Sequence, residues 1–141
     1  MKTDEKLVYV PMAADILHPG HVNILKIASQ YGKVIVGLFT DEAIKSYKPN
    51  PYMDYGQRKI VLESVKYVSE IVPQVSRDYI PNLKKYKPAY MVHGKDWREG
   101  PLAEARKNAI ETMAEWGGEV IGPDYTEGVS SSVLKKRVNG N

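Results

Sequence analysis

Three histidines are the residues of this sequence best suited to chemistry, and each follows or ends a stretch expected to be a buried strand. Two of them stand three residues apart in the segment His18-Pro19-Gly20-His21. If a helix begins near Pro19, both imidazoles lie on one face of its first turn. Free backbone N–H groups and the positive end of the helix dipole favour an anion at that place. Two ring donors there could hold phosphate oxygens while negative charge builds up in a transition state.

The rest of this segment fits the same interpretation. Gly20 has no side chain to keep a phosphate from the backbone, and Pro19 loses nothing at a position whose N–H has no helical partner. Two other interpretations stay open on spacing alone: a histidine pair that caps a loop, and half of a metal site. The metal site is the weaker of these, because paired helical ligands usually need a third one.

A second segment, His93-Gly94-Lys95-Asp96-Trp97, closes another predicted strand. Its glycine gives room, Asp96 gives a charged acceptor and Trp97 gives a stacking face. That combination suits recognition of a nucleotide base or of a magnesium-bound phosphate. A plain strand end with a buried indole explains the segment equally well when it is taken alone.

The third candidate is the hydroxyl-rich segment at residues 126–132, just before the last predicted helix. Its hydroxyls and free amides could wrap a second stretch of a polyphosphate, although one serine acting as a helix cap is the simpler explanation. Lys48 lies in a loop with Pro49 and Pro51, and Arg58 lies in the helix after it. Such cations could neutralise an anion, but each alone is more often a solvated surface charge.

These segments need elements that bring them to one place, and the apolar pattern predicts such elements. Apolar runs predict strands over residues 7–12, 34–39, 71–72, 90–93 and 120–121, with Pro73 ending the third. Helical spacing predicts helices over residues 22–31, 41–47, 55–67, 79–86, 102–116 and 131–138, the second capped by Thr40 or Asp41. The alternation predicts one doubly wound α/β domain over residues 1–141, with a mostly parallel five-stranded sheet and helices on both faces. Ligands of such sheets bind at the carboxyl ends of the strands, where the candidate segments stand.

Composition narrows the function classes. The chain has 141 residues, of which 43% are hydrophobic and 26% charged, as is usual for a soluble globular domain. It has no cysteine, which excludes thiolate catalysis and cysteine-ligated metals. The net charge is only +3, so we expect an anionic small-molecule partner and no nucleic acid. The N-terminal apolar stretch is too short for a signal sequence or a membrane span, so we expect a cytoplasmic protein without membrane partners.

Taken together, the segments resemble the cytidylyltransferase family that is marked by the His-x-Gly-His motif. The resemblance covers nearly the whole chain: residues 15–21, 40–41, 55–58, 94–97 and 126–131. His-x-Gly-His alone is only moderately specific, because some adenylyltransferases share it. The Thr-Glu-Gly-Val-Ser-Ser segment, together with Gly-x-Asp-Trp, is much more specific for cytidylyl transfer. Residues 88–94 and 115–119 look like the cytidylyltransferases associated with phosphoenolpyruvate phosphomutase, which activate phosphonates.

The resemblance implies a Rossmann-like fold and a role for each segment. The catalytic residues would be His18, His21 and Lys48, with both histidines stabilising the transition state. The phosphate groups or the acceptor would be contacted by Asp15, Asp41 and Arg58. CTP would enter with Mg²⁺ bound through its phosphates, without a metal ligand from the protein. The nucleotide would be held by Ala13, Ala14, Gly20, His93, Gly94, Asp96, Trp97, Thr126, Glu127, Gly128, Val129, Ser130 and Ser131.

The expected chemistry is in-line attack by an ionised phosphonate or phosphate oxygen on the α-phosphorus of CTP, with release of pyrophosphate. Such an acceptor needs no strong general base. Glycerol-3-phosphate cytidylyl transfer is the nearest alternative. A catalytically silent CTP-binding module is another, because Tyr125 stands where relatives usually have an arginine and Lys95 where an aspartate is common. Dimeric relatives suggest a homodimer through Val61, Val65 and Val68, although such spacing is more often simple core.

Overall fold

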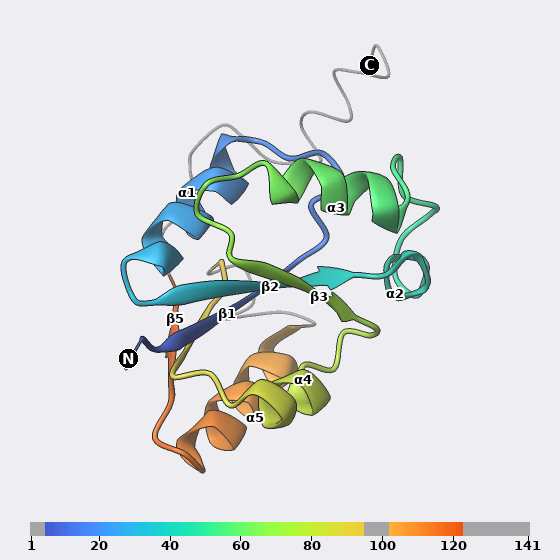
Figure 1. Ribbon diagram of the computed structural model, residues 1–141. Coiled ribbons are helices and arrows are strands. Elements are labelled where there is room, and N and C mark those ends of the chain that lie inside the picture. The colour runs from blue at the N-terminus through green and yellow to red at the C-terminus, as the bar shows by residue number, and fades with distance from the viewer. Residues whose placement is uncertain (1–4, 95–101, 123–141) are drawn as a thin grey trace.

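The protein, described by a computed structural model over residues 5–94 and 102–122, is built on one parallel sheet (Figure 1). Five strands form it, in the spatial order β3-β2-β1-β4-β5, and every neighbouring pair is parallel. The prediction of an α/β fold with a five-stranded parallel sheet is therefore confirmed. The strands are β1 (Leu7–Met12), β2 (Lys33–Phe39), β3 (Glu70–Gln74), β4 (Tyr90–Val92) and β5 (Glu119–Ile121).

Helices cover both faces of the sheet, as predicted. Figure 1 shows α1 and α3 on one face and α4 and α5 on the other, while α2 lies beside the end to which β2 points. The helices are α1 (Pro19–Ser29), α2 (Asp41–Lys45), α3 (Tyr55–Glu63), α4 (Ile80–Tyr86) and α5 (Ala103–Ala114). Within the described residues, no helix has the length and apolar character needed to cross a membrane.

Each face of the sheet has its own buried core, because successive side chains of a strand point to opposite faces. Tyr9 and Met91 contribute to the core under α4 and α5. Val8, Val10 and Val36 contribute to the core under α1 and α3. A strand buried on both sides needs an apolar residue at nearly every position, which explains the continuous apolar runs of β1 and β2.

Several predicted boundaries differ from the observed ones by one to four residues, and three of these differences are described here. Pro73 does not end β3 but pairs with Leu38 inside it, and this is tolerated because β3 is an edge strand, where a missing N–H costs no ladder bond. Helix α1 begins at Pro19, three residues before the predicted start, since His18 caps it. Helix α3 ends at Glu63, short of the predicted residue 67.

The strands all end on one side of the sheet, which we call the carboxyl edge. It is formed by the segments at residues 13–18, 40–54 (which includes α2) and 75–79, together with residues 93 and 94. The turns at the opposite side, the amino edge, return each helix to the next strand. Strand β1 has β2 on one side and β4 on the other, so chain order reverses beside it. In open parallel sheets a ligand binds at the carboxyl edge near such a reversal.

Candidate active site

The segment after β1 starts a helix with its two histidines, in the way their spacing predicts. His18 is the N-cap of α1 and has extended backbone angles, and Pro19 follows within the first helical turn. The Gly20 N–H donates to His18 Nδ1 at 3.0 Å, and the His18 N–H donates to His21 Nδ1 at 3.2 Å. This is a reciprocal capping box with imidazole nitrogens in place of the usual oxygens. The capping interpretation and the anion-binding interpretation therefore describe the same residues.

These contacts define what the two rings offer to a ligand. Each Nδ1 accepts a backbone N–H, so each neutral ring carries its proton on Nε2. The ring centroids are 3.9 Å apart, which places the two rings side by side at the N-terminal end of α1. The two N–H donors and the positive end of the helix dipole therefore lie together. Such an arrangement favours the binding of an anion.

The charge state of the rings agrees with a donor role. Burial lowers the pKa of His18. Burial, helped by the nearby His18 and Lys48, lowers the pKa of His21 to about 3. Both rings are therefore neutral near pH 7 in the unliganded protein, and each keeps one proton, on Nε2. Within the described part of the chain they also belong to no cluster of three or more His, Asp or Glu residues able to hold a metal ion.

Gly20 is required by the position of the His18 ring. A Cβ at this position would lie 2.7 Å from His18 Cε1, which is closer than side chains approach. Any other residue would therefore push the His18 ring out of its capping position. The expectation that Gly20 opens the backbone to a phosphate stays a prediction.

Asp15 and Arg58 lie at the carboxyl edge, but the structure buries both. Asp15 is 4% exposed, and its carboxylate accepts the N–H groups of Tyr52 and Met53 at 2.9–3.1 Å. It thereby attaches the loop before α3 to the end of β1. A direct contact with the acceptor stays a prediction for this residue, and the structure gives it a positioning role.

Arg58 joins the ends of two strands to α3. It is fully buried, and its guanidinium donates to the carbonyl oxygens of Ala13 and Phe39 at 2.8 and 2.7 Å. It also donates to the Met53 carbonyl and forms an ion pair with Asp41 at 2.7 Å. The predicted contacts of Arg58 and Asp41 with the acceptor remain untested, but both side chains are already engaged with each other.

Two further features shape the edge near the histidines. Ala14 is buried and has a left-handed backbone with φ 51°, an uncommon conformation for a residue with a Cβ. It turns the chain between Ala13 and Asp15, immediately before the histidine segment. Lys48 follows α2, and its charge is one of those that lower the pKa of His21. Lys48 is therefore close enough to act electrostatically on His21, while its catalytic role stays a prediction.

The third histidine marks the end of β4. His93 Nδ1 lies 2.9 Å from the Gly94 carbonyl oxygen, so Nδ1 is the protonated nitrogen. His93 Nε2 then accepts the Tyr79 hydroxyl at 3.3 Å. The tautomer is thus opposite to that of His18 and His21. Tyr79 comes from the loop after β3, so this contact joins two neighbouring parts of the carboxyl edge.

The remaining predicted nucleotide contacts lie outside the described residues. They are Asp96, Trp97, Thr126, Glu127, Gly128, Val129, Ser130 and Ser131, and the departures Lys95 and Tyr125 lie there too. Sequence reasoning missed Arg77 and Tyr79, which follow β3 at the same edge. The rule that ligands bind at strand ends would have found them, if it had been applied to the third predicted strand as well as to the others.

Comparisons with known proteins identify relatives in sequence and in fold. Residues 13–137 match the model of the cytidylyltransferase-like family. A glycerol-3-phosphate cytidylyltransferase of Staphylococcus aureus is 33% identical over 128 residues, which cover 89% of each chain. An ethanolamine-phosphate cytidylyltransferase of Arabidopsis thaliana is 28% identical and matches 93% of this chain but 32% of its own length. A lipopolysaccharide core biosynthesis protein from Thermoplasma volcanium shares the fold, with a TM-score of 0.70 and 20% identity over 86% of this chain and 97% of its own.

The family model and these relatives make the protein a nucleotidyltransferase, an enzyme that transfers a nucleotidyl group to an acceptor. With most of its length matching the family model, the chain belongs to the cytidylyltransferase-like family. The identities near 30% establish the family and the reaction class.

Proposed function

We propose that this enzyme transfers the cytidylyl group of CTP to a small phosphonate or phosphate monoester and releases pyrophosphate. The observation that carries the proposal is the pair of neutral imidazoles at the start of α1, each with its Nε2–H free of the capping contacts. A helix start with two such donors favours the triphosphate as charge moves onto the leaving group.

The reaction needs little more from the protein than position and charge. An acceptor oxygen that is already ionised attacks the α-phosphorus, the new P–O bond forms, and the bond from the α-phosphorus to the bridging oxygen breaks. Pyrophosphate leaves with that oxygen, and its developing charge falls to the imidazole donors and to Lys48. Positioning of the two anions in line is the main source of acceleration in such displacements.

Magnesium would enter with CTP, bound to its phosphates. Among the described carboxylates of the carboxyl edge, Asp15 accepts two backbone N–H groups and Asp41 pairs with Arg58. These residues do not form a ligand set for a metal, so we derive no step through the ion. The dependence on Mg²⁺ stays part of the proposal.

The acceptor half of the reaction has two candidates. The phosphonate acceptor rests on the resemblance of residues 88–94 and 115–119 to phosphonate enzymes. Glycerol 3-phosphate is the second candidate, because three relatives of 28–33% identity bear the name glycerol-3-phosphate cytidylyltransferase. Both acceptors present an ionised oxygen on phosphorus, so the same edge could serve either.

The test is pyrophosphate release by the purified protein with Mg²⁺, with each of CTP, ATP, GTP and UTP against a panel of phosphonates and phosphate monoesters. Release with CTP and one class of acceptor is the expected result. Binding of CTP without release for any acceptor would instead support the silent nucleotide-binding module. Activity with glycerol 3-phosphate alone would replace the phosphonate acceptor and leave the reaction class intact.

A further inference from the structure

A buried polar network lies beneath the loop at residues 75–79. None of its side chains has a role in the reaction proposed above. Tyr9 in β1 is fully buried, and its hydroxyl is hydrogen-bonded to Gln74 and accepts from Asn82 Nδ2 at 2.8 Å. Gly37 in β2 makes room for this ring, because an added Cβ there would collide with the Tyr9 hydroxyl. Burying a phenol this deeply is costly unless its hydroxyl is partnered, and burial raises its pKa strongly.

The network holds the loop through its backbone. Gln74 is 2% exposed, and its Nε2 donates to the carbonyl oxygens of Ser76 and Asp78 at 2.8 and 3.0 Å. Asn82 in α4 donates to the Pro73 carbonyl at 2.9 Å. The loop is therefore attached from below at both ends by amide groups that the Tyr9 hydroxyl fixes in turn. A fully satisfied network of this kind gives a loop one defined conformation.

The loop carries two side chains to the carboxyl edge. The Arg77 guanidinium carbon lies 4.5 Å from the centre of the Tyr47 ring, next in sequence to Lys48. Tyr79 contacts His93 at the end of β4. Beside them, Arg77, Tyr79 and Asn108 are among the residues that line a pocket of about 250 Å³. The loop thus stands between the Lys48 loop and the end of β4.

Arg77 differs from Arg58, the other arginine described at this edge, in having no acidic partner within the described residues. Arg58 is fully buried and paired with Asp41. Within residues 5–94 and 102–122, Arg77 forms no ion pair, and its side chain is partly exposed. An arginine stacked on an aromatic face keeps its N–H groups at the rim of its plane, where they can bind a phosphate or phosphonate in bidentate fashion.

We infer that Arg77 binds the anionic group of the acceptor, and that the Tyr9–Gln74–Asn82 network is the device that positions it. The inference rests on the proposed function and names the cation on the acceptor side of that same site. Arg77 would be a binding residue, whereas Tyr9 would be a positioning residue that acts through the loop.

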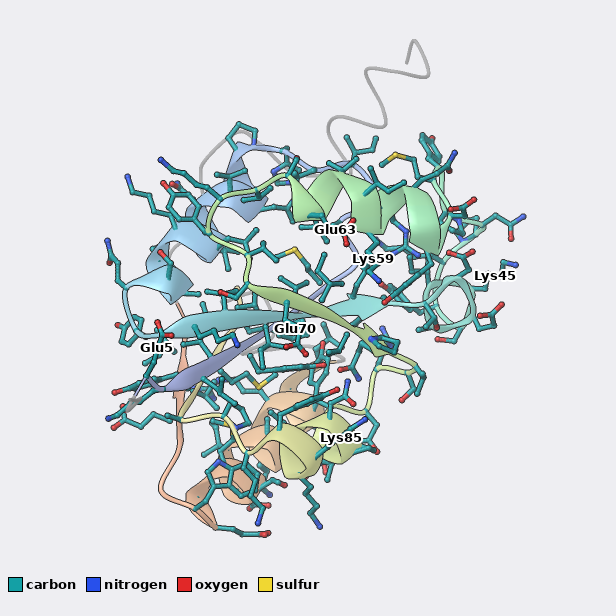
Figure 2. All side chains as sticks on the ribbon, viewed as in Figure 1. Glu5, Lys45, Lys59, Glu63, Glu70 and Lys85 are labelled. Carbon is teal, nitrogen blue, oxygen red and sulfur yellow. The ribbon has the colours of Figure 1, made fainter. Side chains whose placement is uncertain are left out.

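The first test compares Arg77→Gln with Lys85→Gln. Lys85 also lies over a tyrosine ring, at 5.3 Å from the centre of Tyr86, but it stands near the end of α4 that leads to the amino edge (Figure 2). Both variants lose one positive charge and one ring contact. We expect Arg77→Gln to raise the acceptor KM by about 10–100-fold, the loss of a charge-assisted bidentate contact, with the KM for CTP nearly unchanged. Lys85→Gln should change neither.

The second test compares Tyr9→Phe with Tyr86→Phe, which also loses one tyrosine hydroxyl. We expect Tyr9→Phe to raise the acceptor KM by about 3–10-fold, since one well-formed hydrogen bond is worth roughly that factor, while the KM for CTP stays unchanged. A purely structural role would lower the urea midpoint of Tyr9→Phe and leave both KM values alone.

The outcomes separate this inference from the function on which it rests. If the unmodified protein releases no pyrophosphate with any acceptor, the proposed function fails and the role of Arg77 falls with it. If the unmodified protein is active but Arg77→Gln keeps its acceptor KM, only the role of Arg77 is refuted. A rise in the acceptor KM of Arg77→Gln supports the inference, provided that the acceptor KM of Arg77→Lys lies between those of Arg77→Gln and the unmodified protein.

Discussion

At the scale of single residues, the two histidines cap α1, and we propose that they also bind phosphate. Their Nδ1 atoms cap the start of α1, and this fixes Nε2–H as the group that a ligand meets. A serine or aspartate cap would satisfy the same backbone N–H groups but offer no second donor to a phosphate. The chemistry that we propose would account for a cap made of imidazoles.

The role of the donors predicts the effect of losing one. We expect His21→Ala to lower kcat by about 10²–10³-fold, as for removal of one oxyanion donor. The variant also loses half of the capping box, so its fold is checked by urea unfolding under the assay conditions. Near-normal turnover of a folded His21→Ala protein would contradict the assignment.

Titration of the same ring gives a prediction in the unliganded protein. With its pKa lowered from 6.5 to about 3, His21 should show no protonation by NMR between pH 8 and pH 5. The unfolded chain then binds a proton that the folded protein does not, so stability rises with pH between about 3 and 6.5 and falls as the pH drops through that window. The slope from this one ring is at most about 1.4 kcal/mol per pH unit. Urea unfolding of His21→Gln should lose that slope, and a normal titration near pH 6.5 would refute the neutral donor.

At the scale of elements, the carboxyl edge is held together by charged groups placed beneath the reacting surface. Arg58 fastens α3 to the ends of β1 and β2, and Asp15 fastens the loop before α3. The sequence predicted that both residues contact the phosphate groups or the acceptor, and that contact stays a prediction. In the structure, their buried contacts hold the strand ends and the loop that border the site.

This difference can be tested on stability. We expect Arg58→Met to lower the free energy of unfolding by about 3–5 kcal/mol, because it leaves buried carbonyl oxygens and Asp41 without their partner. Lys59→Met, one residue further along α3, is the matched control. If Arg58→Met keeps its stability and only the acceptor KM rises, the predicted phosphate contact is correct and the structural role is wrong.

Many strand bounds and helix caps could be predicted from the sequence, because they depend on residues that are close together in the chain. The apolar run of β1 predicted its bounds, and Thr40 caps α2 as one of the two predicted residues. The direction of Arg58 could not be predicted, since a lone arginine in a helix does not show which strand ends it will reach. The Tyr9 network was missed for the same reason. A tyrosine in an apolar run signals core, and its partners lie 65 and 73 residues away.

At the scale of the whole molecule, the proposed homodimer needs an apolar face that the single chain leaves uncovered. Val65 and Val68, which the sequence suggested for this face, pack against the core under α1 and α3. Ile60 in α3 is 68% exposed and stands next to Val61. If α3 meets its copy, Ile60 is the better anchor.

Sedimentation measures this directly. We expect the unmodified chain to sediment as a dimer, and Ile60→Glu to shift it to a monomer because the substitution places a charge in an apolar contact. Ile110, exposed on α5, is the control position, and Ile110→Glu should leave the dimer intact. A monomer for the unmodified chain would refute the homodimer.

The separation of the two edges has a practical consequence for protein engineering. The described site residues stand at the carboxyl edge, while the turn after α5 at the amino edge contains Gly117, which is exposed and has open space where a Cβ would point. A reporter peptide inserted after Gly117 would lie across the sheet from the described site residues, so we expect pyrophosphate release to survive the insertion. The same peptide placed in the 75–79 loop would separate Arg77 from the amide that holds it. One side of the molecule is therefore available for labels and fusions, and the other is not.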